Sequence, residues 1–159
     1  MKKTMKKIIT VFGYAFIVFI VLMIAAAVTV VVLGKKFDNE SRAYVDTAVQ
    51  AIAADWDIAE LQKRASPEFN DAVDYGDLED DFTTLQQLGK LVEYKGSSGD
   101  SNITISLGGY AVTADYTAIA EFEAGSAEMR VSLVRRKGRW QILDFTVNPE
   151  SFVERKDVV

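Results

Sequence analysis

The chain has 159 residues, with 18 Lys and Arg, 23 Asp and Glu, and neither His nor Cys. This length provides one domain of ordinary size. The first 36 residues carry six lysines and no acid, whereas the rest carries all 23 acids against 12 basic residues. That acidic balance argues against a nucleic-acid partner. The lack of His and Cys excludes imidazole metal ligands, Ser-His-Asp and Cys-His catalysis, disulfides and iron–sulfur clusters.

An uncharged apolar segment covers residues 8–34, and about 20 apolar residues suffice to cross a membrane. Four lysines precede it within residues 1–7 and two follow it, which predicts a cytoplasmic N-terminus and an exported acidic domain. The alternative is a signal peptide cleaved at the small residues 25–27. Cleavage there would leave an apolar tail on the mature protein, so we expect a retained transmembrane helix over 8–34.

Three helices are predicted beyond this segment. Residues 38–41 offer capping side chains for the first, and Asp57-Ile58-Ala59-Glu60 has the form of a capping box for the second. Ser66-Pro67 is typical of a short helical turn, and Asp77 can cap a third helix that Gly89 closes. The first of these helices has apolar residues at the spacing of one helical face, at Tyr44, Val45, Ala48, Val49 and Ile52.

After Gly89 the apolar period becomes that of strands, and five are predicted. A turn at residues 96–100 would separate the first two, and Gly108-Gly109 would make a hairpin between the second and the third. In the third strand, even-numbered residues from Tyr110 to Phe122 share the inner face. The inward alternation of the fifth strand fails at Phe145, which predicts a bulge near Leu143-Asp144. Residues 38–148 are thus expected to form an α+β domain of three helices on a curved five-stranded antiparallel sheet, followed by a tail at 149–159.

The order of these elements and their aromatic residues resembles a known superfamily. Trp56-Asp57 and Ser66-Pro67-Glu68-Phe69 lead into a sheet that ends in the sequence KGRWQILDF, residues 137–145. Over residues 40–148 this pattern resembles the nuclear-transport-factor-two-like superfamily, the cone-shaped fold of ketosteroid isomerase and the SnoaL cyclases. Membrane-anchored relatives include the periplasmic scaffold protein of type IV secretion systems and other small exported bacterial proteins. The resemblance implies a location at the bacterial inner (cytoplasmic) membrane, with a periplasmic or extracellular cone-like domain, but no single activity.

A cone of this kind has a pocket at its open end. The aromatic and sulfur side chains expected around it belong to Trp56, Phe69, Tyr110, Tyr116 and Met129. An isomerase-like reaction would also need a carboxylate base inside the cone. Asp115 has the outward parity and Asp144 lies at the expected bulge, so no catalytic residue and no cofactor are assigned.

Two charged segments are candidates for other contacts. The acidic stretch of residues 71–81 does not match the spacing of a calcium loop, so we predict no metal site there. A basic hairpin tip on the acidic domain is a candidate partner-binding surface, and it comprises Arg135, Arg136, Lys137 and Arg139.

These features predict a single-pass membrane protein that is not an enzyme. Its exported domain would bind a protein partner or a second copy of itself, as an accessory or scaffold subunit of a cell-envelope complex. The alternative is a membrane-tethered module that holds a small apolar ligand in the cone. A cone-fold enzyme ranks last, because no carboxylate base is placed in the cone.

Overall fold

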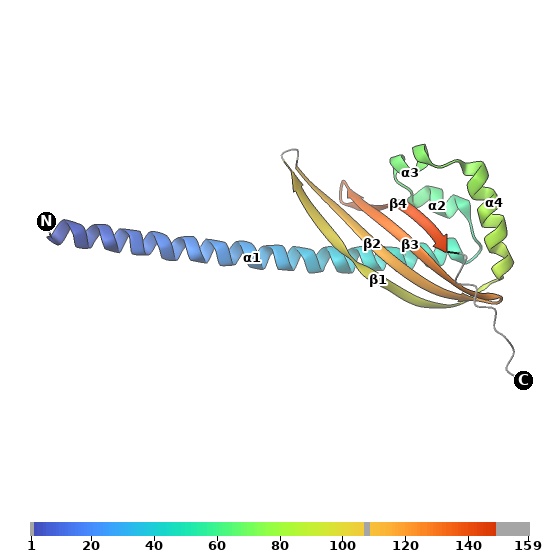
Figure 1. The fold of residues 1–159 in the computed structure, drawn as a ribbon, viewed down its shortest axis with the longest axis horizontal. Coiled ribbons are helices and arrows are strands. Elements are labelled where there is room, and N and C mark those ends of the chain that lie inside the picture. Colours follow the sequence, from blue (N-terminus) through green and yellow to red (C-terminus); the bar gives the residue numbers. More distant parts are fainter. Residues whose placement is uncertain (1, 107–108, 149–159) are drawn as a thin grey trace, which may run out of the picture. The chain divides into compact units, whose positions relative to one another are not determined.

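The computed structural model describes the backbone of residues 2–106 and 109–148; the predicted tail at 149–159 lies outside these residues. The architecture is α+β, with a long apolar N-terminal helix and a four-stranded antiparallel sheet in the order β1-β2-β3-β4 (Figure 1). Two compact units, Met1–Lys36 and Phe37–Val159, are described separately. The elements are α1 (Lys2–Ala53), α2 (Ile58–Arg64), α3 (Pro67–Ala72), α4 (Tyr75–Leu85), the 3₁₀ helix η1 (Gln86–Leu88), β1 (Leu91–Ser106), β2 (Gly109–Phe122), β3 (Gly125–Arg136) and β4 (Arg139–Asn148).

Helix α1 is continuous, so the prediction of a separate helix capped at residues 38–41 is wrong. Between residues 8 and 53 there is no proline, and the two glycines, Gly13 and Gly34, are weak helix breakers. The potential capping residue Ser41 is buried, and its hydroxyl donates to the carbonyl of Phe37 one turn earlier (2.7 Å). Polar residues of this type favour helix starts but do not enforce them.

The second unit has one hydrophobic core on one face of the sheet. The predicted apolar face of α1 is confirmed, since Val45, Ala48, Val49 and Ile52 are buried in the same cluster as the inward residues of β2, β3 and β4. On β2 the even-numbered residues from Val112 to Phe122 are buried, as the alternation predicted. The opposite face of the sheet carries exposed residues such as Asp115 and Ile119.

The three short helices begin at side-chain caps. The predicted caps of α2 and α3 are confirmed, because Asp57 accepts from the backbone of Ala59 (2.8 Å) and Ser66 from that of Phe69 (3.2 Å). Helix α4 begins earlier than predicted, and its cap is Asp74 rather than Asp77. Gly89, with φ of 78°, ends η1.

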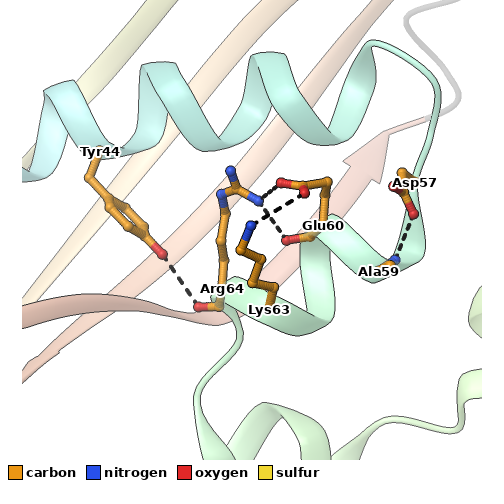
Figure 2. Close-up of polar contacts among 6 residues, drawn as sticks. All are labelled: Tyr44, Asp57, Ala59, Glu60, Lys63 and Arg64. Carbon is orange, nitrogen blue, oxygen red and sulfur yellow. Dashed lines mark hydrogen bonds and ion pairs between the residues drawn. The ribbon is translucent and has the colours of Figure 1, made fainter.

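A hydrogen bond joins helix α2 to α1, and ion pairs lie within α2 (Figure 2). The hydroxyl of Tyr44 donates to the backbone carbonyl of Arg64 (3.4 Å). The guanidinium of Arg64 also forms an ion pair with Glu60, and its hydrogen bond lowers the pKa of that carboxyl. Burial raises the pKa of the Tyr44 hydroxyl, which is therefore held as a donor.

The sheet has four strands rather than five, because the predicted turn at residues 96–100 lies within the continuous strand β1. A Cβ atom on Gly99 would lie 2.0 Å from the carbonyl oxygen of Asp115 on β2. This glycine therefore permits a close approach of two strands instead of a reversal. Register shifts between Leu91 and Glu93 and between Tyr94 and Gly96 adapt β1 to β2.

The predicted hairpin and bulge can both be located. Ser106 pairs with Gly109, so the hairpin joins β1 to β2, although residues 107–108 lie outside the described part. On β4, Asp144 pairs with Ser132 and Ile142 with Leu133, which leaves Leu143 as the additional residue. The bulge predicted from the parity of Phe145 is thereby confirmed.

Candidate functional site

Four of the five predicted pocket residues are core residues. Trp56 is 2% exposed and Met129 0% exposed, and Phe69 and Tyr116 belong to the same buried cluster. The Trp56 ring stacks on Phe122 with centroids 5.3 Å apart. The fifth residue, Tyr110, is 70% exposed, although it shares the parity of the inner face.

The phenol of Tyr116 is engaged by α1. Its oxygen lies 2.9 Å from the hydroxyl of Ser41, and it donates to the carbonyl of Asp38 (3.1 Å). This network fixes the ring against the helix and satisfies a buried hydroxyl. The arrangement is that of a structural tyrosine packed between the helix and the sheet.

A row of polar contacts, the α1–β1 ladder, covers the outer edge of β1. From α1, the Asp38 carboxylate accepts from the backbone and hydroxyl of Ser101 (2.8 and 2.6 Å), and Arg42 donates to the carbonyl of Gly99 (3.2 Å). One turn later, Asp46 accepts from the hydroxyl of Ser97 (2.6 Å). Four helical residues rise about 6 Å and two strand residues about 6.6 Å, so the two spacings match over the two steps that separate these three contacts.

The ladder has a consequence for what this surface can bind. Because β1 is an edge strand, its outward backbone groups would otherwise be available for pairing with another chain. The carbonyl of Gly99 and the N–H of Ser101 are already bonded to α1. The middle of this edge is therefore closed to strand addition.

The four residues of the predicted basic hairpin have different surroundings. Arg135 forms an ion pair with Glu40 (3.3 Å), and its guanidinium lies 4.9 Å from the ring centroid of Phe37. Arg136 pairs with Glu68 on α3. Lys137, with φ of 48°, and Arg139 lie exposed at the turn. Of the four, Lys137 and Arg139 best meet the needs of a docking surface.

The outer face of the sheet is polar and slightly hollowed. Asp100, Asp115, Ser132 and Asp144 follow one another across the four strands, and the hydroxyl of Ser132 donates to Asp115 (2.6 Å). Arg130, one row away, pairs with Glu128 (3.3 Å). Within the described residues no group of three or more acidic side chains is arranged to hold a metal ion. This face is suited to solvent or to a hydrated protein contact.

An apolar groove between α4 and β4 was not recognised from the sequence. Its volume is about 400 Å³, and its lining combines Leu78, Asp81, Phe82, Thr84 and Leu85 of α4 with Phe145, Thr146 and Val147 of β4. The rings of Phe82 and Phe145 pack at 6.5 Å on its floor, where both residues are buried. Leu78 and Val147 are partly exposed, and Asp81 and Thr146 are exposed at the rim. The helical spacing of the α4 residues was the available signal, but it predicts a core face equally well.

The first unit has a different character. The apolar side chains of α1 from Phe16 to Leu33 are exposed, and this is the helix, among the described residues, that is long and apolar enough to cross a membrane. Exposed apolar side chains of this kind suit a lipid environment.

Comparisons with known proteins add no evidence about these surfaces. No family model matches the chain, and neither the curated proteins nor the solved structures include a significant match.

Proposed function

We propose that this protein is a single-pass membrane protein whose C-terminal domain binds another protein, as an accessory or scaffold subunit of a bacterial cell-envelope complex. In this proposal α1 is a retained signal anchor in the inner membrane, the N-terminus is cytoplasmic, and the domain is periplasmic or extracellular. The observation that carries the proposal is the burial of Trp56, Phe69, Tyr116 and Met129 in one closed core. Since the interior is filled by its own side chains, the outer surfaces are the better candidates for recognition.

Membership of the cone-fold superfamily belongs to the same proposal. Four antiparallel strands, with helices covering one face, support it. In a cone-fold protein of this form, residues 37–53 of α1 would be the helix inside the curved sheet. The interior would then be a structural core and not a cavity for substrate.

A small apolar ligand remains the second candidate, and the groove between α4 and β4 favours it. Such a ligand would contact Leu78 and Val147 and not the residues that the resemblance placed around the cone. A cone-fold enzyme still ranks last, because the hydroxyl of Tyr116 is committed to α1 and, among the described residues, no carboxylate is buried in the core.

The test is recovery of the tagged full-length protein from its native membrane in mild detergent, followed by mass spectrometry. A stoichiometric membrane partner is expected. Recovery of the protein alone would contradict the subunit role, and recovery with itself alone would reduce the proposal to a homodimer. Peptides from residues preceding Ala25 must also be found in the mature protein, because their loss would mean a cleaved signal peptide.

Charge-reversal variants then test whether the partner binds at the turn between β3 and β4. Lys137→Glu and Arg139→Glu are preferable to changes at Arg135 and Arg136, whose ion pairs with Glu40 and Glu68 join separate elements. Lys90→Glu, at another exposed position, is the matched control. Loss of the partner with the hairpin variants but not with the control would assign the contact to this turn.

A further inference from the structure

The two edges of the sheet are closed to different extents. At β1 the α1–β1 ladder occupies the middle of the edge. At β4 the contact is a single parallel bridge between Ala65 and Ile142, with a hydrogen bond from the N–H of Ser66 to the carbonyl of Ile142 (2.7 Å). Beyond the bulge at Leu143, residues 144–147 pair with β3 on one side, and no other strand within residues 2–106 and 109–148 pairs with them on the other.

The apolar groove runs along this same part of β4. Three consecutive residues, Phe145, Thr146 and Val147, line it, so it follows the strand and does not lie over one face alone. Its other wall is one side of α4, with Leu78, Phe82 and Leu85 at helical spacing. A strand added to a sheet lies about 4.8 Å from its neighbour and places alternate side chains on one side. A groove between an edge strand and a helix can therefore receive every second side chain of an added peptide.

The rim of the groove is acidic. Helix α4 has the sequence YGDLEDDFTTL, with four acids and no basic residue, and Asp81 lies at the groove itself. An incoming segment with Lys or Arg between its apolar residues would be complementary to this rim.

We propose that the groove between α4 and β4 binds an extended segment of a partner protein, which adds to the edge of β4 as a strand. The segment carries apolar side chains at alternate positions, which enter the groove, and basic side chains beside them, which face Asp81. This inference rests on the protein-binding role proposed above and assigns that role to a particular surface.

A labelled hexapeptide of alternating valine and lysine is a direct probe. Its binding to the full-length protein in detergent micelles is measured by fluorescence anisotropy, and hydrogen exchange locates the site. A peptide of the same composition with the valines and lysines in separate blocks tests the alternation. The alternating peptide with N-methylated backbone tests strand pairing, because it lacks the donors that the edge of β4 needs.

Two variants test the surface without altering the buried floor. Leu78→Gln removes a partly exposed wall residue, and Asp81→Lys reverses the rim charge. Asp80→Lys is the matched control, because it makes the same charge change at an exposed neighbouring position that does not line the groove. We expect each groove variant to weaken binding of the alternating peptide about tenfold or more, and the control to weaken it far less. The amides of residues 143–147 should exchange more slowly in the complex.

Equal loss of binding with Asp80→Lys and Asp81→Lys would overturn the proposal, and so would undiminished binding of the N-methylated peptide. Protection confined to other strands, or binding that appears only after residues 149–159 are deleted, would overturn it as well. The last result would identify the C-terminus of this chain as the occupant. If a compact apolar dye competes with the N-methylated peptide, the groove is a small-ligand site instead. A membrane partner still recovered with Leu78→Gln and Asp81→Lys would preserve the protein-binding role while rejecting this groove.

Discussion

Replacing Asp46 with alanine tests whether the α1–β1 ladder stabilises the second unit. One oxygen of the Asp46 carboxylate accepts from the hydroxyls of Tyr94 (2.7 Å) and Ser97 (2.6 Å), and all three residues are partly buried. Hydrogen bonds to a charged group contribute about 1.5–3 kcal/mol each when buried. Because the two donors share one oxygen and regain some water, we expect Asp46→Ala to lower the free energy of unfolding by about 2 kcal/mol.

Urea unfolding of the full-length protein in mild detergent measures this loss. The buried side chains of Trp56 and Trp140 provide the fluorescence signal. Thr47→Ala is the control, since this exposed residue on the same helix bonds only the backbone of its own helix, at Ala43. Its substitution should change stability by less than about 0.5 kcal/mol.

A double-mutant cycle with Tyr94→Phe separates the pair from its surroundings. If Asp46 and Tyr94 interact directly, the sum of the losses in unfolding free energy of the two single variants should exceed the loss of the double variant by about 1 kcal/mol. Strict additivity, or an Asp46→Ala variant as stable as the control, would refute the reasoning. The α1–β1 ladder would then not stabilise the second unit.

Three further predictions concern the core, a strand contact and pH. Met129→Ala should lower the free energy of unfolding by about 2–5 kcal/mol in urea titrations, and a smaller loss would mean that the residue lines an open pocket and not the core. Gly99→Ala should destabilise by about 1–3 kcal/mol, since its Cβ would meet the β2 backbone at 2.0 Å, whereas Ser98→Ala should be nearly neutral. Burial, and then the neighbouring Asp46, raise the pKa of Tyr94, so the folded state retains a proton that the unfolded chain releases near pH 10. The stabilisation that comes from this proton is complete below about pH 10 and is lost as the pH rises further. The Tyr94→Phe variant should therefore lose less stability than the unchanged protein between about pH 9 and 11, and identical pH profiles of the two proteins would contradict this.

The sheet was predictable wherever the sequence pattern of one strand shows which of its side chains are buried. The inward residues of β2 alternate with exposed ones, because that strand is buried on one face only. The bulge at Leu143 was also visible, since Phe145 has a core side chain at the wrong parity for a regular strand. In both cases the evidence lies within a single strand.

The first strand was mispredicted because local preference and long-range pairing disagree there. Glycine, serine and aspartate at residues 96–100 favour a turn when considered alone. In the structure every one of these residues pairs with β2, from Gly96 opposite Ile119 to Asp100 opposite Asp115. Pairing along two long strands, aided by the close approach at Gly99, outweighs the local preference for a turn.

The candidate sites were harder to predict than the elements. Tyr116 and Met129 were assigned to a pocket because aromatic and sulfur side chains suit either a pocket wall or a core, and parity does not distinguish the two. Leu78, Phe82 and Leu85 give the same helical spacing whether they face a core or the wall of a groove. For the α4 residues, the distance between α4 and β4 decides between a core and a groove, and these elements are more than fifty residues apart in the chain.

The polar residues of the ladder show the same limit most clearly. Asp38 and Ser41 were taken as helix caps, and Ser97 as part of a turn, because small polar side chains serve nearby backbone in those settings. Both expected cap residues also have remote partners, since Asp38 bonds Ser101 across 63 residues, and Ser41 bonds Phe37 one turn earlier but also meets Tyr116 across 75 residues. A residue that can satisfy the backbone locally can also fasten a helix to a sheet, and only the fold decides between the two. Because the contacts of Asp38 with Ser101 depend on the fold, the sequence alone does not indicate that α1 lies along the edge of β1.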